Sequence, residues 1–171
     1  MKLTSETINN LIFPLVGTIA GALLTYKFTE RFEKKRLKID VKIGLLRDFL
    51  SLSDEIEKSS IKANNLLVNG IIEGSFSSDY INSLLISFLE NSNLLCSNIE
   101  LNKIFFKENL KLFDILEVYD RERSIFYTRY KYILQRLHKD NIEELNDLLS
   151  NFLSTGYKLK ENINEILIKL I

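Results

Sequence analysis

The chain has 171 residues, of which 23 are Lys or Arg and 23 are Asp or Glu, so its formal net charge is zero. This balance excludes a protein that binds nucleic acid or another polyanion through its overall charge. The single cysteine, Cys96, excludes an internal disulfide, and the 46% of hydrophobic residues suffices for one packed core. With 6 Gly and 1 Pro, the composition favours helices throughout.

The N-terminal region contains a long uncharged run, LIFPLVGTIAGALLTY, at residues 11–26. As an α-helix this run is about 24 Å long, and residues 8–10 and 27–28 extend it to the ~30 Å of a bilayer core. Pro14 lies in the first turns, where a missing amide donor costs least. We therefore expect a transmembrane helix over about residues 8–28, with residues 1–27 forming the N-terminal segment and anchor.

Two alternatives to an anchor fit the same run. Ala20-Gly21-Ala22 has the small-x-small form of a signal-peptide cleavage site. Against cleavage, the apolar run continues through Leu23 and Leu24, and basic residues follow at once. The run is also short enough to be a buried or interfacial helix.

Basic residues after the run predict its orientation. Before it, the only positive groups are Lys2 and the initiator amine. The basic residues that follow are Lys27, Arg31, Lys34, Lys35, Arg36 and Lys38. Because an excess of Lys and Arg stays cytoplasmic, we expect a single-pass protein of the inner (cytoplasmic) membrane, with a short N-terminus outside and residues 28–171 in the cytoplasm. The same cluster is predicted to contact anionic lipid headgroups.

Small residues within the run favour packing between membrane helices. Gly17 and Gly21 form a G-x-x-x-G pair, with Ala20 beside it. Such a face lets two helix backbones approach closely, although short motifs of this kind also occur by chance.

Alternating spacings of three and four between apolar residues predict the helices of residues 28–171. The final stripe is Ile142, Leu145, Leu149, Phe152, Gly156, Leu159, Ile163, Ile166 and Leu170, and a second is Ile81, Leu85, Phe88, Ser92, Leu95 and Ile99. We expect helices over about 28–68, 79–98, 103–138 and 142–170. The fold class is all-α: an up-and-down, antiparallel four-helix bundle with coiled-coil-like packing. Gly156 is the break in its stripe, and it either admits a bulky neighbour or kinks the helix.

The sequence contains no constellation typical of an enzyme, a cofactor site or a metal site. The single histidine, His138, excludes most zinc and di-iron sites, and we interpret it as a cap near a helix C-terminus. We interpret Cys96, which lies among apolar residues, as a small core residue. Serines are plentiful but lack a partner base, so no nucleophile is predicted.

One soluble segment, YDRERSIFYTRYKY at residues 119–132, combines tyrosines with basic residues. Aromatic rings and guanidinium groups together can hold a nucleotide, a phosphorylated partner or single-stranded nucleic acid. Arg123 falls in an apolar stripe, where its charge needs a partner, so we expect either an ion pair with a carboxylate of another helix or a ligand contact. The candidate site is Arg123, Tyr119, Phe126, Tyr130 and Arg129. The alternative is that its aromatic residues are core and Arg129 is solvated.

These observations predict a bacterial, membrane-anchored scaffold, tether or sensor without catalysis of its own. Its expected partners are membrane lipid and either another protein or a second copy, with nucleic acid disfavoured and a small-molecule ligand undetermined. A rival hypothesis is a membrane-perturbing effector of the toxin or phage-defence type, whose transmembrane helices cluster on activation. A further hypothesis is a bundle that senses a ligand through Arg123 and its aromatic neighbours.

Overall fold

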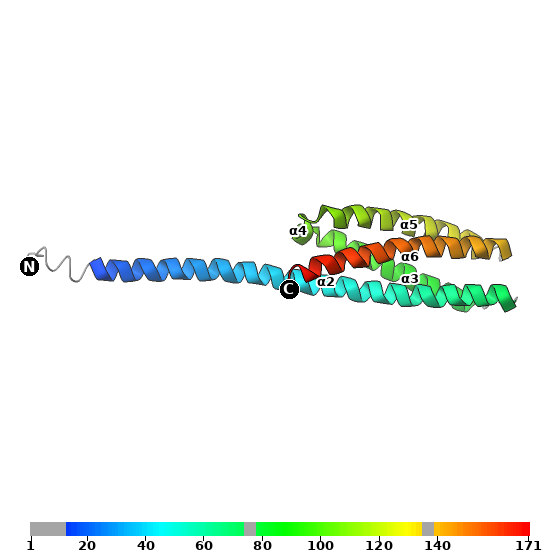
Figure 1. Ribbon diagram of the computed structural model, residues 1–171, viewed down its shortest axis with the longest axis horizontal. Helices are drawn as coiled ribbons and strands as arrows, with labels where there is room; N and C mark the ends of the chain where they lie inside the picture. Colours follow the sequence, from blue (N-terminus) through cyan, green and yellow to red (C-terminus); the bar gives the residue numbers. More distant parts are fainter. Residues whose placement is uncertain (1–12, 74–77, 135–138) are drawn as a thin grey trace, which may run out of the picture. The chain divides into compact units, whose positions relative to one another are not determined.

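The computed structural model describes residues 13–73, 78–134 and 139–171, and every element in these ranges is helical. The elements in chain order are α2 (Phe13–Glu73), α3 (Ser78–Leu101), α4 (Lys103–Phe106), α5 (Leu110–Leu134) and α6 (Lys139–Ile168) (Figure 1). The expected all-α fold class is confirmed, as is a helical bundle.

The chain divides into two compact units. Unit 1 is Met1–Val41 and unit 2 is Lys42–Ile171, so the division falls inside α2 and later in the chain than the boundary expected at residue 27. In unit 1, the described residues form the first part of α2.

No helix among the described residues is both long and apolar enough to cross a bilayer. Within α2 the apolar residues from Phe13 give way to charges from Lys27 onward. The expected span of residues 8–28 begins in residues 1–12, which lie outside the described ranges.

Unit 2 is a bundle of antiparallel helices. Figure 1 shows α3 returning beside the second half of α2, α5 running out again, and α6 returning to the end where α4 lies. Of the helix pairs, α5 and α6 pack together most extensively. At the α4 end, the Phe106 ring lies 5.9 Å from that of Phe49 on α2, and Lys111 pairs with Glu165 of α6 at 3.3 Å.

Heptad spacing explains how α2 packs in unit 2. Its buried positions alternate by three and four: Leu46, Phe49, Ser53, Ile56, Ser60, Ala63 and Leu67. Burying a large apolar side chain contributes about 1.5–3 kcal/mol. The buried serines donate to carbonyls one turn earlier in their own helix, Ser53 to Phe49 at 2.8 Å and Ser60 to Ile56. The buried face of α2 is therefore apolar apart from two serines, whose hydroxyls bond to carbonyls of the same helix.

Aromatic rings form the centre of the core. The Phe152 ring centroid lies 4.9 Å from that of Phe88 and 4.7 Å from that of Tyr119, and Phe126 meets Phe88 edge-on at 5.5 Å. These rings come from α3, α5 and α6. Edge-to-face pairs add about 0.5–1.5 kcal/mol each beyond the apolar area that they bury.

The helix boundaries depart from expectation in two places. The helix expected over residues 103–138 is divided, because the chain turns after Phe106 with the Asn109 amide donating to the Phe106 carbonyl at 2.7 Å. The Asn109 carbonyl then accepts from Leu112 at 2.9 Å as α5 begins. At the first loop, α2 continues through Gly70 to Glu73. A glycine inside a helix costs only about 1 kcal/mol, which the surrounding helix tolerates.

Candidate functional site

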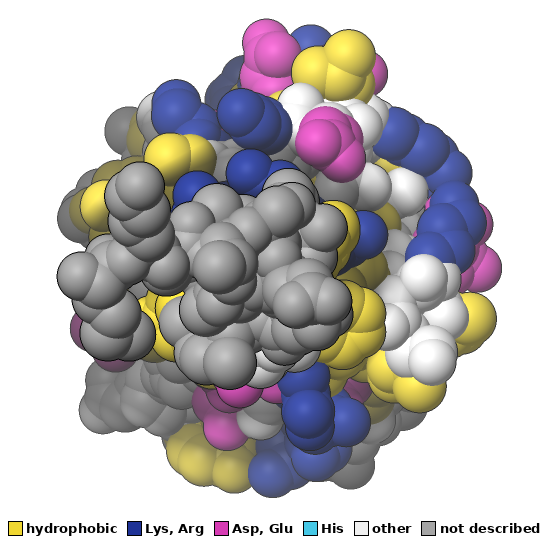
Figure 2. Space-filling view, turned by 90° about the vertical axis from the view of Figure 1, so that its left-hand side faces the viewer, with side chains coloured by type: hydrophobic (Ala, Val, Ile, Leu, Met, Phe, Trp, Pro, Cys, Tyr) yellow, Lys and Arg dark blue, Asp and Glu magenta, His cyan; other side chains and the backbone are white. Residues whose placement is uncertain are grey.

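The predicted lipid-contacting cluster lies on the unit 1 part of α2, and all its basic side chains are exposed. Lys34 pairs with Glu30 at 2.6 Å, and Arg36 pairs with Asp40 at 3.9 Å. Within the described part of this unit, the cations without an ion pair are Lys27, Arg31, Lys35 and Lys38. Figure 2 shows blue Lys and Arg side chains beside yellow hydrophobic ones at the surface.

Large apolar side chains on the same stretch of helix are also exposed. They are Ile19, Leu23, Leu24, Tyr26, Phe28, Phe32, Leu37 and Val41, with exposed fractions from 45% to 73%. A Cβ built at Gly21 meets nothing within 4 Å, and Ala20 is exposed. Gly17 lies in the same helix, although its surroundings fall outside the described side chains. In unit 1 the apolar residues thus lack a covering element among the described residues.

The candidate site on α5 separates into core and surface residues. Tyr119, Phe126 and Tyr130 are buried, whereas Arg129 is exposed. They therefore do not line one common cleft.

Arg123 pairs within its own helix. Its Nη2 and Nε donate to Oδ1 of Asp120 at 2.6 and 2.9 Å, and its Nη1 donates to Oδ1 of Asn93 on α3 at 3.1 Å. The carboxylate expected from another helix is replaced by one a single turn away. The Arg123 side chain is 22% exposed, so water shares the solvation of its charge.

Cys96 lies buried beside this ion pair. Burial and the nearby Asp120 carboxylate raise the pKa of the Cys96 thiol to about 12, against a smaller opposing effect of Arg123. The thiol therefore stays protonated at neutral pH, which disfavours nucleophilic chemistry because the thiolate is the reactive form.

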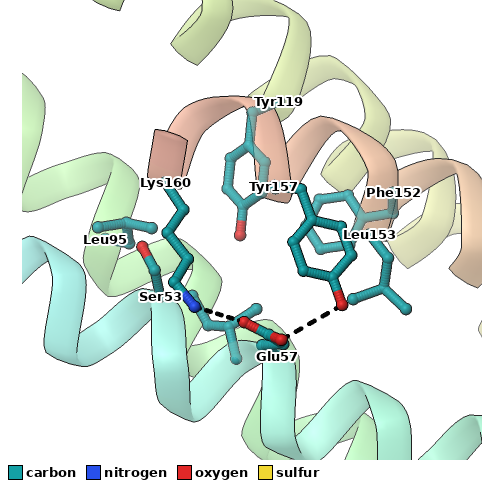
Figure 3. Close-up of a pocket in the computed structure, with 10 residues that line it drawn as sticks. Ser53, Glu57, Leu95, Tyr119, Phe152, Leu153, Tyr157 and Lys160 are labelled. Atoms are coloured by element: carbon teal, nitrogen blue, oxygen red, sulfur yellow. Dashed lines mark hydrogen bonds and ion pairs between the residues drawn. The ribbon is translucent and has the colours of Figure 1, made fainter. Parts of the chain in front are cut away.

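A cavity with a volume of about 20 Å³ lies inside unit 2 (Figure 3). Its lining comes from α2, α3, α5 and α6: Ser53, Ile56, Glu57, Leu95, Tyr119, Phe152, Leu153, Gly156, Tyr157 and Lys160. The Tyr119 side chain is buried, and its hydroxyl has no hydrogen-bond partner among the protein atoms. Burial raises the pKa of this hydroxyl, so it remains a neutral donor.

Gly156 makes room for the Tyr119 ring. A Cβ built on Gly156 would stand 3.4 Å from Cε2 of Tyr119. Gly156 was expected either to admit a bulky neighbour or to kink the helix. The short distance to Tyr119 supports the first of these. Tyr119 thereby reaches the space between α2 and α6.

A polar clasp, defined as Lys160, Asp54, Glu57 and Tyr157, joins α6 to α2 beside the cavity. Lys160 Nζ lies 2.7 Å from Asp54 Oδ1 and 2.6 Å from Glu57 Oε2. The Tyr157 hydroxyl donates to Glu57 Oε1 at 3.3 Å. Hydrogen bonds to the two carboxylates raise the pKa of Lys160, and partial burial together with Glu57 raises that of Tyr157.

The clasp and the cavity offer positioning and hydrogen bonding. Among the described residues, no group of three or more His, Cys, Asp or Glu side chains is arranged to hold a metal ion. His138 lies outside the described residues. Nothing in the sequence pointed to the clasp, and the only signal for the cavity was Gly156 in the apolar stripe of α6.

Comparison of the chain with protein-family models, with curated proteins and with solved structures finds no match.

Proposed function

We propose that this protein is a membrane-anchored helical tether: residues 8–28 hold it in a bilayer, and the bundle of unit 2 binds a protein partner or a second copy on the cytoplasmic side. It carries no catalysis of its own. The observation that carries the proposal is the exposed apolar surface of unit 1, where Phe28 and Phe32 are 67% and 73% exposed. Exposed apolar patches mark membrane or protein contacts, because water covers such surface at a free-energy cost.

Charge supports the cytoplasmic orientation. Among the described residues of unit 1, the cations without an ion pair, which include Lys35 and Lys38, all follow the uncharged run. Each adds about 1 kcal/mol of attraction to an anionic leaflet when close to it.

The α4 end of unit 2 supports a protein-binding role. Leu101, Ile104 and Leu110 are 79%, 70% and 71% exposed, although each belongs to a residue type that prefers burial. Leu101 ends α3, Ile104 lies in α4 and Leu110 begins α5, so the three residues lie where α3 turns into α5. An apolar corner of this kind fits a partner helix or the same corner of a second copy.

Membrane attachment is tested by extracting membranes that contain the full chain with alkaline carbonate. We expect the protein to stay in the pellet, and a variant with Leu23→Lys and Leu24→Lys to be released. A lysine reagent that cannot cross membranes should label the Lys34–Lys38 tract only after the cells are broken. Release of the unaltered chain, or labelling of intact cells, would overturn the anchor or its orientation respectively.

Binding at the α4 end is tested by chemical crosslinking in native membranes. Ile104→Glu should reduce the crosslinked species at least tenfold, while the control Ile61→Glu, at a 42% exposed position on α2, should leave it unchanged. Crosslinking of the purified chain to itself identifies a second copy, and crosslinking only in membranes identifies another protein. A strictly monomeric chain in both settings contradicts the proposal.

The open face at Gly21 favours a second candidate function, a membrane-perturbing effector. Because nothing lies within 4 Å of a Cβ built there, a second anchor helix has room to approach. Induced expression should then cause dye leakage that Gly17→Leu or Gly21→Leu abolishes. Gly44→Leu is the matched control, since Gly44 has equal space but lies in unit 2. Harmless expression at high level argues against this function.

A further inference from the structure

The cavity of unit 2 contains a hydrogen-bond donor that no protein atom satisfies. Tyr119 is 1% exposed, and its hydroxyl has no partner within hydrogen-bond geometry. The nearby Ser92 hydroxyl donates to the Phe88 carbonyl at 2.7 Å. It is close enough to oppose the effect of burial on the pKa of the Tyr119 hydroxyl, but it lies outside hydrogen-bond geometry with that hydroxyl. A buried hydroxyl without a hydrogen bond costs folding free energy, so native proteins rarely contain one. Where no protein atom is in place, an ordered water usually supplies the bond.

The size of the cavity matches one water molecule. Its volume is about 20 Å³, and a bound water needs at least about 10–15 Å³ measured in this way. Figure 3 shows the Tyr119 oxygen directed into the space framed by the labelled residues. Most of that lining is apolar, and the cavity is partly open on the side of Tyr157 and Lys160, which also line a larger groove between α2 and α6.

Two polar groups of α2 complete the site. Ser53 donates its own hydrogen to Phe49 at 2.8 Å, so the lone pairs of its hydroxyl stay available to accept. The Glu57 carboxylate accepts from Lys160 and Tyr157 and retains further acceptor capacity. A water molecule needs two to four polar partners, and Tyr119, Ser53 and Glu57 supply three.

We propose that this cavity is a binding site for a single ordered water, which accepts the Tyr119 hydroxyl and donates to Ser53 and Glu57. The water joins α5 to α2 in the middle of the bundle. It thereby fixes the register of α2, because a purely apolar heptad stripe leaves neighbouring registers close in energy, while a buried polar junction matches only one.

The sign of one substitution tests the site. Tyr119→Phe removes the hydroxyl and keeps the ring. With the water bound, the variant loses a hydrogen bond and leaves the water short of a partner, so its Tm should fall by about 3–5 °C. Without the water, Phe relieves an unsatisfied donor and its Tm should rise. A fall of Tm that disappears in a Ser92→Ala background would assign the hydrogen bond to Ser92 and overturn the site. Tyr130→Phe, at the other buried tyrosine of α5, gives the general effect of removing a hydroxyl from this helix.

Direct detection of the water decides the question independently of Tm. In the full chain in detergent micelles, the Tyr119 ring protons should show nuclear Overhauser effects to a long-lived water, and Tyr119→Phe should lose them. Gly156→Ala, whose methyl enters the cavity, should lose them as well while circular dichroism stays helical. Absence of the water signal in the unaltered chain, or a rise of Tm in Tyr119→Phe, overturns the proposal.

Discussion

The two parts of α2 use the same heptad phase in opposite surroundings. Counting back from Leu46 of unit 2 by alternating fours and threes leads to Ile39, Phe32 and Phe28 of unit 1. Leu46 is 0% exposed, whereas Phe32 is 73% exposed. Hydrophobic periodicity therefore identifies the face of a helix that needs a partner, but not whether this chain supplies the partner.

The polar residues that interrupt the phase differ between the two parts. In unit 2 the first is Lys42, at the boundary with unit 1, and those within the buried seam from Leu46 onward are Ser53 and Ser60, whose hydroxyls are satisfied by their own helix. In unit 1 the interruption is Lys35, whose ammonium cannot be satisfied in this way. A serine can be buried inside a bundle because its hydroxyl bonds to its own helix. A lysine on the same face needs water or an anionic surface near its ammonium group.

The largest expected effect comes from truncating one phenylalanine in each part. Phe49→Ala should lower the free energy of unfolding by about 3–5 kcal/mol, because the side chain is 1% exposed and contacts Phe106. Phe32→Ala should change it by less than about 0.5 kcal/mol. Urea unfolding of the full chain in micelles, followed by circular dichroism, measures both. Equal losses would mean that a partner covers Phe32.

An intermediate effect is expected from the lysine ion pairs. Lys160 and Lys34 both stand 2.6 Å from a glutamate, but their side chains are 33% and 69% exposed. Lys160→Met should lower the free energy of unfolding by about 1 kcal/mol at neutral pH, and Lys34→Met by about 0.3 kcal/mol at most.

The pH dependence of the Lys160 effect provides its control. Because the pKa of Lys160 is raised above 10.5 on folding, its stabilisation is complete below that pH and is lost as pH rises through the folded pKa. The difference between Lys160→Met and the unaltered chain should therefore shrink above pH 10.5. A difference that stays constant to higher pH would assign the effect to packing of the lysine stem.

The smallest effect is expected from two glycines with open surroundings. Gly44→Ala in unit 2 should raise the free energy of unfolding by about 0.5–1 kcal/mol, since Cβ meets nothing within 4 Å and alanine favours helix. Gly21→Ala should leave the Tm of unit 2 unchanged, because it lies in unit 1. Equal rises of Tm in scanning calorimetry would show that the two units unfold together.

Periodicity predicted the core of unit 2 well where one face of a helix meets the bundle. Every member of the stripe from Ile81 to Ile99 on α3 is buried. On α2 the spacing is less decisive, since apolar residues also stand outside the buried seam: Leu67 is buried, its neighbour Leu66 is half-buried, and Val41 is 45% exposed. A wide apolar surface leaves the exact phase open, because several neighbouring residues qualify equally.

The cavity and the clasp were beyond the reach of the sequence. The pairing of Lys160 with Glu57 depends on which helices are neighbours and on how far each is shifted along its axis. Spacing within one helix carries no information on that shift. Arg123 was predicted to need a partner, but a carboxylate one turn away satisfied it more simply than one from another helix.

The burial of Cys96 makes its thiol a natural probe of local opening in the bundle. Burial raises the pKa of its thiol to about 12 and the side chain is 7% exposed, so the reactive thiolate is scarce at neutral pH. A maleimide added to the folded chain should therefore react with Cys96 only when local opening of the bundle exposes the thiol on α3. The rate of that reaction reports how readily the bundle opens, and it needs no engineered cysteine.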